Sequence, residues 1–449
     1  MSTLWQSIDI PKREPLKGEI YTECAVIGGG LAGIMTAFEL KKRGFEVVLI
    51  EADRILSGAT KGTTAKITAQ HGFIFDKLQS KISPLSARLY FESNKEAIDK
   101  IERLIFEENI DCDFERVPSY IFSTEDTDSL IKERMALARL RIDTTYVTKT
   151  GLPFSVNGAI RLENQAQFNP LKFASALSEN LKIYEKTPAL KISTEGVKTP
   201  EGFIHAKYTV ICTHYPVENF PGLYFLRQHQ ERSYLLAVKT EKRVGGMYIS
   251  GNGVSLRDYP EGVLIGGEAH RTGKNKKSGC YMELQSLAKK YFPEGEIVYS
   301  WSNQDVMTHD RLPFIGRYSM FTPNLFVATG FNKWGMSLCA VASDLIPDLI
   351  EGKENRYEKL YTPRRINFLA ALPDLLVDVG YSVKGLISGL FSEKEKRCSH
   401  LGCRLKENPE EGTLECPCHG SEFTRAGEVI FSPAKKPLRV KKVEVERNL

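Results

Sequence analysis

The chain has 449 residues, a length at which one hydrophobic core gives way to two or three domains. With 42% hydrophobic and 26% charged residues, the composition is that of an ordinary globular protein and excludes disordered, collagen-like and disulfide-dense classes. The formal charge of +5, from 61 basic and 56 acidic residues, is too mild to indicate a nucleic-acid-binding surface, so we expect no nucleic-acid partner.

The start of the chain lacks the basic residues, apolar stretch and small-residue cleavage site of a secretory signal. No segment reaches the roughly eighteen uninterrupted apolar residues that a membrane helix needs. The nearest candidate, 368–391, is interrupted by Pro373, Asp374, Asp378 and Lys384. We therefore expect a cytoplasmic protein without a transmembrane segment.

Residues 22–52 predict a strand, a tight turn, a helix and a second strand. The turn holds the pattern G-x-G-x-x-G, in which the glycines allow a tight turn, close approach of a pyrophosphate and packing of helix on strand. An acidic residue ends the next strand, where a carboxylate accepts hydrogen bonds from a ribose. These residues fit FAD and NAD equally, and a glycine-rich turn without nucleotide is the alternative. The predicted dinucleotide site comprises Gly28, Gly30, Leu31, Ala32, Gly33, Glu51 and Ala52.

Two further apolar segments, 208–214 and 324–330, are bounded by turn residues and are predicted to join the same sheet as buried parallel strands. Helical and alternating patterns elsewhere predict a second domain inserted twice into the first. The segments concerned are 83–108, 127–141, 233–240 and 262–267.

Residues 363–396 predict a linker helix, because charge runs surround an amphipathic stretch. We expect its apolar face to pack on the chain's own domains, with a partner or membrane surface as the less favoured alternative. That face consists of Leu376, Val379, Val383, Leu386 and Leu390.

The C-terminal region gathers four cysteines between Cys398 and Cys418. Cys398 and His400 form C-x-H, and Cys416 and His419 form C-x-x-H. Two thiolates suit one iron of a [2Fe–2S] cluster and two imidazoles suit the other, which raises the reduction potential. A zinc site is the alternative, but zinc ligands are normally paired differently along the chain. The remaining cysteines are predicted to be buried, inert thiols: Cys24, Cys112, Cys212, Cys280 and Cys339.

Four segments together resemble the D-amino acid oxidase and glycine oxidase superfamily: GGGLAG, SGATKGTT, 308–316 and 328–336. The similarity covers roughly residues 20–360 and is greatest to amine-oxidising members such as the γ-glutamylputrescine oxidases. It implies FAD as the cofactor, an α/β Rossmann-like FAD-binding domain and an inserted α+β substrate domain with a mixed or antiparallel sheet. The residues that it places around the flavin are Thr60, Thr63, Thr64, Gly330, Lys333, Trp334, Gly335 and Met336.

Two departures from this superfamily bear on function. Monomeric sarcosine oxidases tether flavin through a cysteine where this chain has Asn303, which implies noncovalent FAD. Glycine oxidases carry a substrate-binding arginine where this chain has Asp305, which favours a cationic amine over an anionic amino acid. The alternative is that Asp305 is a surface turn residue. Asp305 and Lys333 are the candidate catalytic residues, and Tyr248, Tyr281, His270 and His309 are possible substrate-side groups that more simply have structural roles.

The stretch CSHLGC…CPCHGSEF resembles the Rieske proteins of respiratory complexes. The resemblance implies cluster ligation by Cys398, His400, Cys416 and His419, a disulfide between Cys403 and Cys418, and a covering proline loop at 432–437. Rieske domains usually place several strands before the first ligand loop, which are missing here. We therefore expect a small, shortened all-β domain that depends on the cluster, the disulfide and docking.

The fusion as a whole resembles FAD-dependent oxidoreductases that carry a C-terminal Rieske domain. It implies oxidation of a C–N bond in a small amine or amino acid by hydride transfer to flavin, with electrons passed through the cluster to a one-electron protein acceptor. The alternative is an electron-transfer adaptor whose flavin is reduced by a partner protein. The predicted division of the chain is an N-terminal arm (1–20), an FAD-binding domain (21–82, 166–220, 301–362), a substrate domain (83–165, 221–300), the linker helix and the Rieske domain (397–449).

Overall fold

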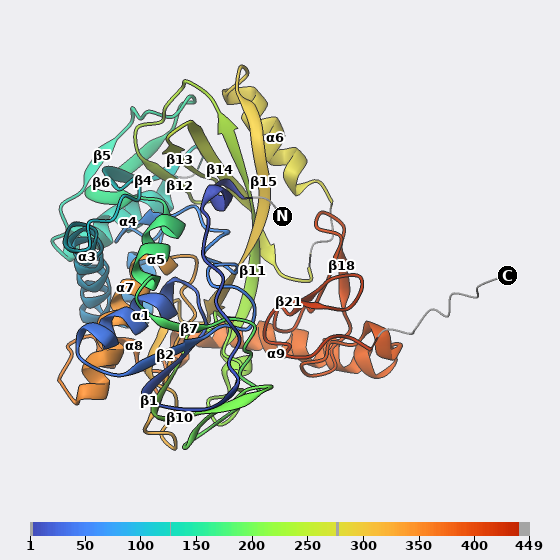
Figure 1. The fold of residues 1–449 in the computed structure, drawn as a ribbon. Helices are drawn as coiled ribbons and strands as arrows, with labels where there is room; N and C mark the ends of the chain where they lie inside the picture. Colours follow the sequence, from blue (N-terminus) through green and yellow to red (C-terminus); the bar gives the residue numbers. More distant parts are fainter. Residues whose placement is uncertain (1–2, 126, 275–277, 440–449) are drawn as a thin grey trace.

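The computed structural model describes residues 3–125, 127–274 and 278–439, and its ribbon shows two large sheets with a small C-terminal sheet at one side (Figure 1). Residues 1–2 of the predicted N-terminal arm and 440–449 of the predicted Rieske domain lie outside the described residues. No helix in the described part of the chain is both long enough and apolar enough to cross a bilayer.

The first sheet is that of the predicted Rossmann-like domain. Its order is β16 (Phe314–Arg317), β17 (Leu325–Thr329), β10 (Gly202–Ile211), β1 (Gly18–Ile27), β2 (Val47–Ile50) and β7 (Lys182–Tyr184), with β9 (Gly196–Lys198) on β10 and β8 (Lys191–Ser193) on β9. The strands β17, β10, β1, β2 and β7 run parallel to one another, which confirms that both apolar segments join the sheet of the first strand.

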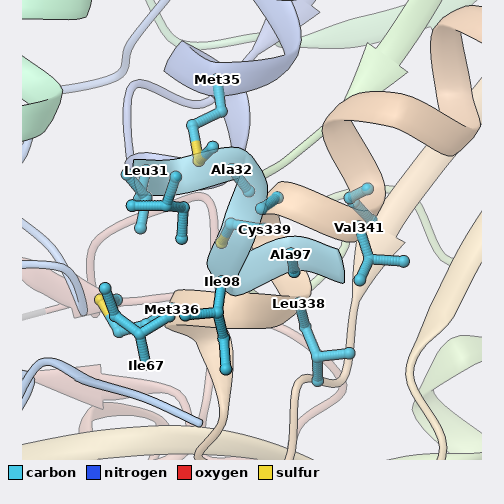
Figure 2. Packing of buried hydrophobic residues seen from close by; sticks show 14 of the residues in the cluster. Leu31, Ala32, Met35, Ile67, Ala97, Ile98, Met336, Leu338, Cys339 and Val341 are labelled. Atoms are coloured by element: carbon cyan, nitrogen blue, oxygen red, sulfur yellow. The ribbon is translucent and has the colours of Figure 1, made fainter. Parts of the chain in front are cut away.

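Three helices from distant parts of the chain pack on one another beside this sheet: α1 (Leu31–Lys42), α3 (Pro84–Glu107) and α7 (Gly335–Glu351). Figure 2 shows part of the hydrophobic cluster to which all three helices contribute, with Leu31 and Met35 from α1, Ile98 from α3 and Leu338 from α7. This core fixes the start of α1 and the start of α7, the two helix N-termini that the sequence places at the flavin.

The second sheet is curled, mixed and mostly antiparallel. Its order is β15 (Glu296–Thr308), β11 (Gln228–Lys239), β14 (Gly262–Arg271), β13 (Ser255–Tyr259), β12 (Met247–Ser250), β4 (Glu115–Ser123), β6 (Gly158–Gln167) and β3 (Lys66–Ile67), with β5 (Thr145–Val147) on β6. The other helices are α2 (Phe75–Lys81), α4 (Asp128–Arg139), α5 (Pro170–Ser178), α6 (Cys280–Tyr291) and α8 (Glu358–Tyr361). The short 3₁₀ turns are η1 (Leu4–Ser7), η2 (Tyr224–Leu226) and η3 (Lys394–Lys396).

The sheets do not follow the predicted domain division at three places. Residues 66–67, 166–167 and 301–308 are assigned by sequence to the FAD-binding segments, but they pair in the second sheet. The domain limits themselves stay a prediction.

The C-terminal region forms a four-stranded antiparallel sheet of short strands: β18 (Lys406–Asn408), β19 (Thr413–Glu415), β20 (Glu422–Phe423) and β21 (Val429–Phe431). It follows α9 (Phe368–Leu390), the helix predicted as a linker. The expectation that the apolar face of this helix packs on the chain's own domains is wrong. Its members Leu376, Val379, Val383, Leu386 and Leu390 are 40–71% exposed. The face that is buried instead carries Asp378, Gly385 and Gly389, which periodicity of large apolar residues does not reveal.

Candidate functional site

The glycine-rich turn leads directly from β1 into α1, with Gly30 as the residue that precedes the helix. A Cβ on Gly28 would lie 2.5 Å from the carbonyl oxygen of Cys212, and one on Gly33 would lie 1.9 Å from that of Gly28. A Cβ on Gly30 would meet nothing closer than Thr60 Oγ1 at 3.4 Å. The first and third glycines are therefore required by packing, while the second leaves the approach to the helix N-terminus open, as pyrophosphate binding requires.

Glu51 follows β2 and is held against this turn. Its carboxylate accepts the Gly29 N–H at 2.7 Å and the Asp53 N–H at 2.9 Å. Burial raises the pKa of Glu51, while these backbone hydrogen bonds oppose the rise. Because each carboxylate oxygen has two lone pairs, the group retains capacity to accept from ribose hydroxyls.

The loop that carries Thr60, Thr63 and Thr64 closes over the same turn. Thr60 Oγ1 accepts the N–H of Leu31 at 3.0 Å, so this threonine touches the first residue of α1. Asn303 of β15 donates to the carbonyl of Ala59 at 3.4 Å. The position where related enzymes tether flavin is therefore beside this loop, and it carries an amide.

The segment from Gly330 to Met336 joins β17 to α7 through a turn in which Lys333 has a positive φ of 74°. Lys333 Nζ donates to Ser233 Oγ at 2.9 Å and lies 3.2 Å from Glu231 Oε2. Burial opposes ionisation of Glu231, but the hydrogen bond from His229 and the charge of Lys333 hold the pKa of that carboxyl well below its usual range. The turn is thus tied to β11 by a charged contact.

Asp305 lies inside β15, opposite Glu231 in the register of the two strands, and not in a surface turn. Burial raises the pKa of Asp305 to about 6, with Glu231 adding to the rise and Lys333 opposing it. Two carboxylates and one ammonium group therefore face one another beside the segment 330–336, which is called the predicted flavin-flanking turn below. The hydroxyls of Tyr248 and Tyr281 instead have protein partners, the carbonyl of Val244 and the carboxylate of Glu411.

The two predicted ligand loops of the C-terminal sheet share one backbone pattern. In the first loop, the Gly402 N–H donates to the Cys398 carbonyl, and in the second the Gly420 N–H donates to the Cys416 carbonyl, both at 2.9 Å. A disulfide joins Cys403 of the first loop to Cys418 of the second. The turns and the bridge hold the two loops face to face.

The donor atoms in these loops fit iron. Cys398 and Cys416 are buried free thiols, and the rings of His400 and His419 lie 5.1 Å apart. Burial lowers the pKa of His400 to about 4 and of His419 to about 3, so both imidazoles are neutral, the form that binds metal. Nδ1 of both histidines is buried without a hydrogen-bond partner, an arrangement that costs free energy unless a metal takes the lone pair.

Strand β11 has one face toward the ligand loops and the other toward Lys333. Side chains alternate along a strand, so Gln230 and Glu231 point in opposite directions. Gln230 Nε2 donates to the carbonyl of His419 at 2.9 Å and to that of Ser432 at 2.8 Å, whereas Glu231 contacts Lys333. A single strand therefore separates the predicted cluster from the predicted flavin-flanking turn.

Arg232 extends the contact of β11 with the C-terminal sheet. Its side chain, 1% exposed, lies 2.7 Å from Glu415 Oε1 and 2.6 Å from Glu422 Oε2. Sequence reasoning missed this trio, because an arginine and two glutamates separated by about 180 residues have no local signature. Gly273, whose N–H donates to Glu415 at 2.6 Å, adds a backbone contact.

Asp378 of α9 forms a second, polar connection that the sequence did not reveal. Its Oδ2 lies 3.1 Å from His229 Nδ1 and 2.8 Å from His309 Nε2, and its Oδ1 pairs with Arg271. Arg271 in turn donates to the carbonyls of Pro417 and Cys418. His309, considered above as a substrate-side group, therefore belongs to the contact between α9, β11 and the second ligand loop.

Two buried cations near the threonine loop were also missed. Lys66 follows that loop and donates to Ser255 Oγ and, at 3.4 Å, to Thr64 Oγ1. Burial and the charge of Arg257 lower the pKa of Lys66 to about 7, and burial lowers the pKa of Arg257 to about 9. Across residues 3–125, 127–274 and 278–439, neither cation has a carboxylate within ion-pair distance.

Comparison with known proteins matches two family models to the chain. The family model described as FAD dependent oxidoreductase matches residues 23–349. The chain belongs to this family. A second model, the Rieske [2Fe-2S] domain, matches residues 390–444, so this family member carries a C-terminal Rieske domain and takes both FAD and a [2Fe–2S] cluster as cofactors.

The similar proteins include one of the same overall architecture. YhfW of Bacillus subtilis, which is named for a Rieske 2Fe-2S iron-sulfur centre, is 36% identical over 97% of each chain. The γ-glutamylputrescine oxidoreductase of Escherichia coli is 22% identical and covers 77% of this chain and 87% of its own. The crystal structure of glycine oxidase from Geobacillus kaustophilus superimposes with a TM-score of 0.66 at 22% identity, covering 77% of this chain and 99% of that one. The fold predicted from the sequence is thereby confirmed.

Proposed function

We propose that this FAD-dependent oxidoreductase oxidises a C–N bond in a small amine or amino acid and that the electrons leave through its Rieske cluster. The similar proteins named above carry γ-glutamylputrescine and glycine in their names, both of which offer a C–N bond. When bound, FAD supplies the hydride acceptor for such a reaction. The residues of this chain supply binding, orientation and charge.

The charges beside the flavin-flanking turn favour a substrate that carries an amine. The hydrogen bond from His229 and the charge of Lys333 keep the pKa of Glu231 low, and burial raises the pKa of Asp305 only to about 6, so at neutral pH both carboxylates carry negative charge. Lys333 balances one of them and donates to Ser233. A substrate ammonium group placed here gains attraction from the second carboxylate, in a site where reduced contact with water strengthens the interaction.

The alternation of β11 is the observation that carries the proposed electron path. Gln230 binds the backbone of the ligand His419, and Glu231, the next residue, binds Lys333 of the flavin-flanking turn. The Rieske domain is held there by buried charged groups, including Arg232, which supports a position of the cluster close to the flavin. A one-electron centre in this position is suited to receiving electrons from reduced flavin.

An anaerobic reduction experiment tests both parts of the proposal. Purified protein is mixed with a panel of primary amines, secondary amines and amino acids, and the visible flavin band and the EPR signal of the reduced cluster are followed together. We expect one member of the panel to bleach the flavin and then to produce the cluster signal. The matched control is His419→Gln, in which the flavin bleaches without a Rieske EPR signal.

Three results contradict the proposal in different ways. If no small donor bleaches the flavin while a protein reductant does, the chain is an electron-transfer adaptor. If flavin bleaches but the cluster stays oxidised under anaerobic conditions, the electron path is wrong although the oxidation is right. If air restores the flavin at the same rate in wild type and in His419→Gln, the cluster is not the exit for electrons.

A further inference from the structure

The helix α9 has two unlike faces. Its inner face packs tightly against the ligand loops: a Cβ on Gly385 would lie 2.4 Å from Cys418 Sγ, and one on Gly389 would lie 2.1 Å from the carbonyl oxygen of Gly402. Its outer face is exposed and apolar, with Leu376 at 63%, Leu390 at 71% and Phe391 at 86% exposure. The ribbon shows α9 at the edge of the molecule beside the C-terminal sheet (Figure 1).

The exposed apolar face is too wide to be a narrow helix–helix seam. With 3.6 residues per turn, its members span an arc of about 180° around the helix, opposite the buried Asp378, Gly385 and Gly389. A two-helix seam uses a narrower stripe, whereas a helix lying in a membrane interface presents a broad apolar half. The residues on this arc are Leu376, Val377, Val379, Val383, Leu386, Ile387, Leu390 and Phe391.

The charges around this face favour an anionic partner. Lys384 is exposed on the border of the arc, and Arg364 and Lys394 are exposed beyond its two ends. The nearby acids are mostly neutralised, because Asp374 pairs with Arg311 at 3.3 Å, Glu393 pairs with Lys396 at 3.1 Å, and Asp378 is buried. Among the described residues flanking the helix, Glu395 is the one carboxylate without an ion-pair partner.

We propose that the outer face of α9 binds the surface of an anionic lipid bilayer, with the helix lying in the plane of the headgroups. The apolar arc enters the boundary of the acyl chains, and Lys384, Arg364 and Lys394 contact lipid phosphates. The bilayer then lies one helix diameter, about 10–12 Å, from the disulfide that joins the ligand loops.

Vesicle binding tests this proposal with the full-length, cofactor-loaded protein. Vesicles of phosphatidylglycerol and phosphatidylcholine in equal amounts are compared with vesicles of phosphatidylcholine alone, and bound protein is measured by flotation. We expect binding to the anionic vesicles that weakens as salt is raised. In the double variant L386E/L390E, the partition coefficient should fall at least on the order of 100-fold, because two leucine side chains no longer enter the bilayer.

A matched control separates this face from general surface hydrophobicity. The variant F106E/M320E makes the same change at two exposed apolar residues far from α9 in the sequence, 86% and 71% exposed, and should bind as wild type does. All variants must retain the wild-type flavin and cluster spectra. A wild-type protein that stays in the unbound fraction overturns the proposal, as does equal loss in both double variants. A dimer in light scattering that L386E/L390E converts to monomer, without vesicle binding, shows that a second copy covers this face and likewise overturns it.

Discussion

Replacing Arg232 by methionine is the most direct test of how the Rieske domain is held. The substitution removes the cation and leaves Glu415 and Glu422 buried and uncompensated, each 1% exposed. Removing one partner of a buried ion pair costs about 3–5 kcal/mol. The lower end applies here, because Glu415 still accepts from Asn408 at 2.7 Å and Glu422 still accepts from Gln304 at 2.7 Å. We expect a loss of about 3 kcal/mol in the free energy that keeps the Rieske domain docked.

The assay follows urea-induced unfolding through the visible circular dichroism of the cluster and separately through flavin fluorescence. In R232M the cluster transition should move to lower urea while the flavin transition changes little. The control R425M breaks an exposed pair with Glu407, 69% and 57% exposed, and should cost less than about 1 kcal/mol. The triple variant R232M/E415Q/E422Q should recover part of the loss, since no buried charge remains. Equal cluster transitions in R232M and R425M would refute this reasoning.

Three further predictions concern the cofactor sites. Gly33→Ala should lower the FAD content of purified protein severely, because its Cβ would lie 1.9 Å from the carbonyl oxygen of Gly28, whereas Gly58→Ala, which meets nothing within 4 Å, should retain FAD. Cys416→Ser should abolish the Rieske EPR signal and leave the flavin absorbance unchanged, as iron analysis and visible spectra will show. In flavin-depleted protein, Lys66 has a pKa of about 7 in the folded state and an ordinary pKa of 10.5 in the unfolded state. Between pH 7 and pH 10.5 the unfolded state therefore binds more protons than the folded state, and the free energy of unfolding rises with pH. Lys66→Met should remove that rise and raise the free energy of unfolding at pH 7 by on the order of 4 kcal/mol, measured by urea titration at pH 7 and pH 9.

The parts of the site that depend on short segments could be predicted from the sequence. The glycine-rich turn could be recognised in the sequence because Gly28 and Gly33 lie against backbone atoms, where any side chain would clash. The predicted cluster ligands could be proposed from the sequence because Cys398 with His400 and Cys416 with His419 stand at short spacings, in two turns that share one backbone hydrogen-bond pattern. In both cases the chemistry needs particular residue types a few positions apart, so the spacing alone carries the information.

The contacts that join the domains could not be predicted in this way. Asp378 and His229 are 149 residues apart, and neither is unusual in its own segment. The buried face of α9 contains Gly385 and Gly389, which allow the ligand loops to pack closely against the helix but bury little apolar area. The large apolar residues of the opposite, exposed face therefore dominate the sequence pattern. Hydrophobic periodicity identifies that a helix is amphipathic but does not say which face meets protein.

The same polar contacts explain how so short a Rieske domain can exist. Its buried hydrophobic cluster is small, and four of its members are the cysteines of the ligand loops and the disulfide. A core of that size does not stabilise an independent domain. The second sheet and α9 supply what the missing strands would otherwise provide: β11 contributes Gln230 and Arg232, and α9 contributes Asp378 and the glycines beneath the disulfide. Since these groups become buried only when the domain is docked, we expect docking and folding of the Rieske domain to be coupled, so that a Rieske domain detached from the rest of the chain would lose its stable ligand loops.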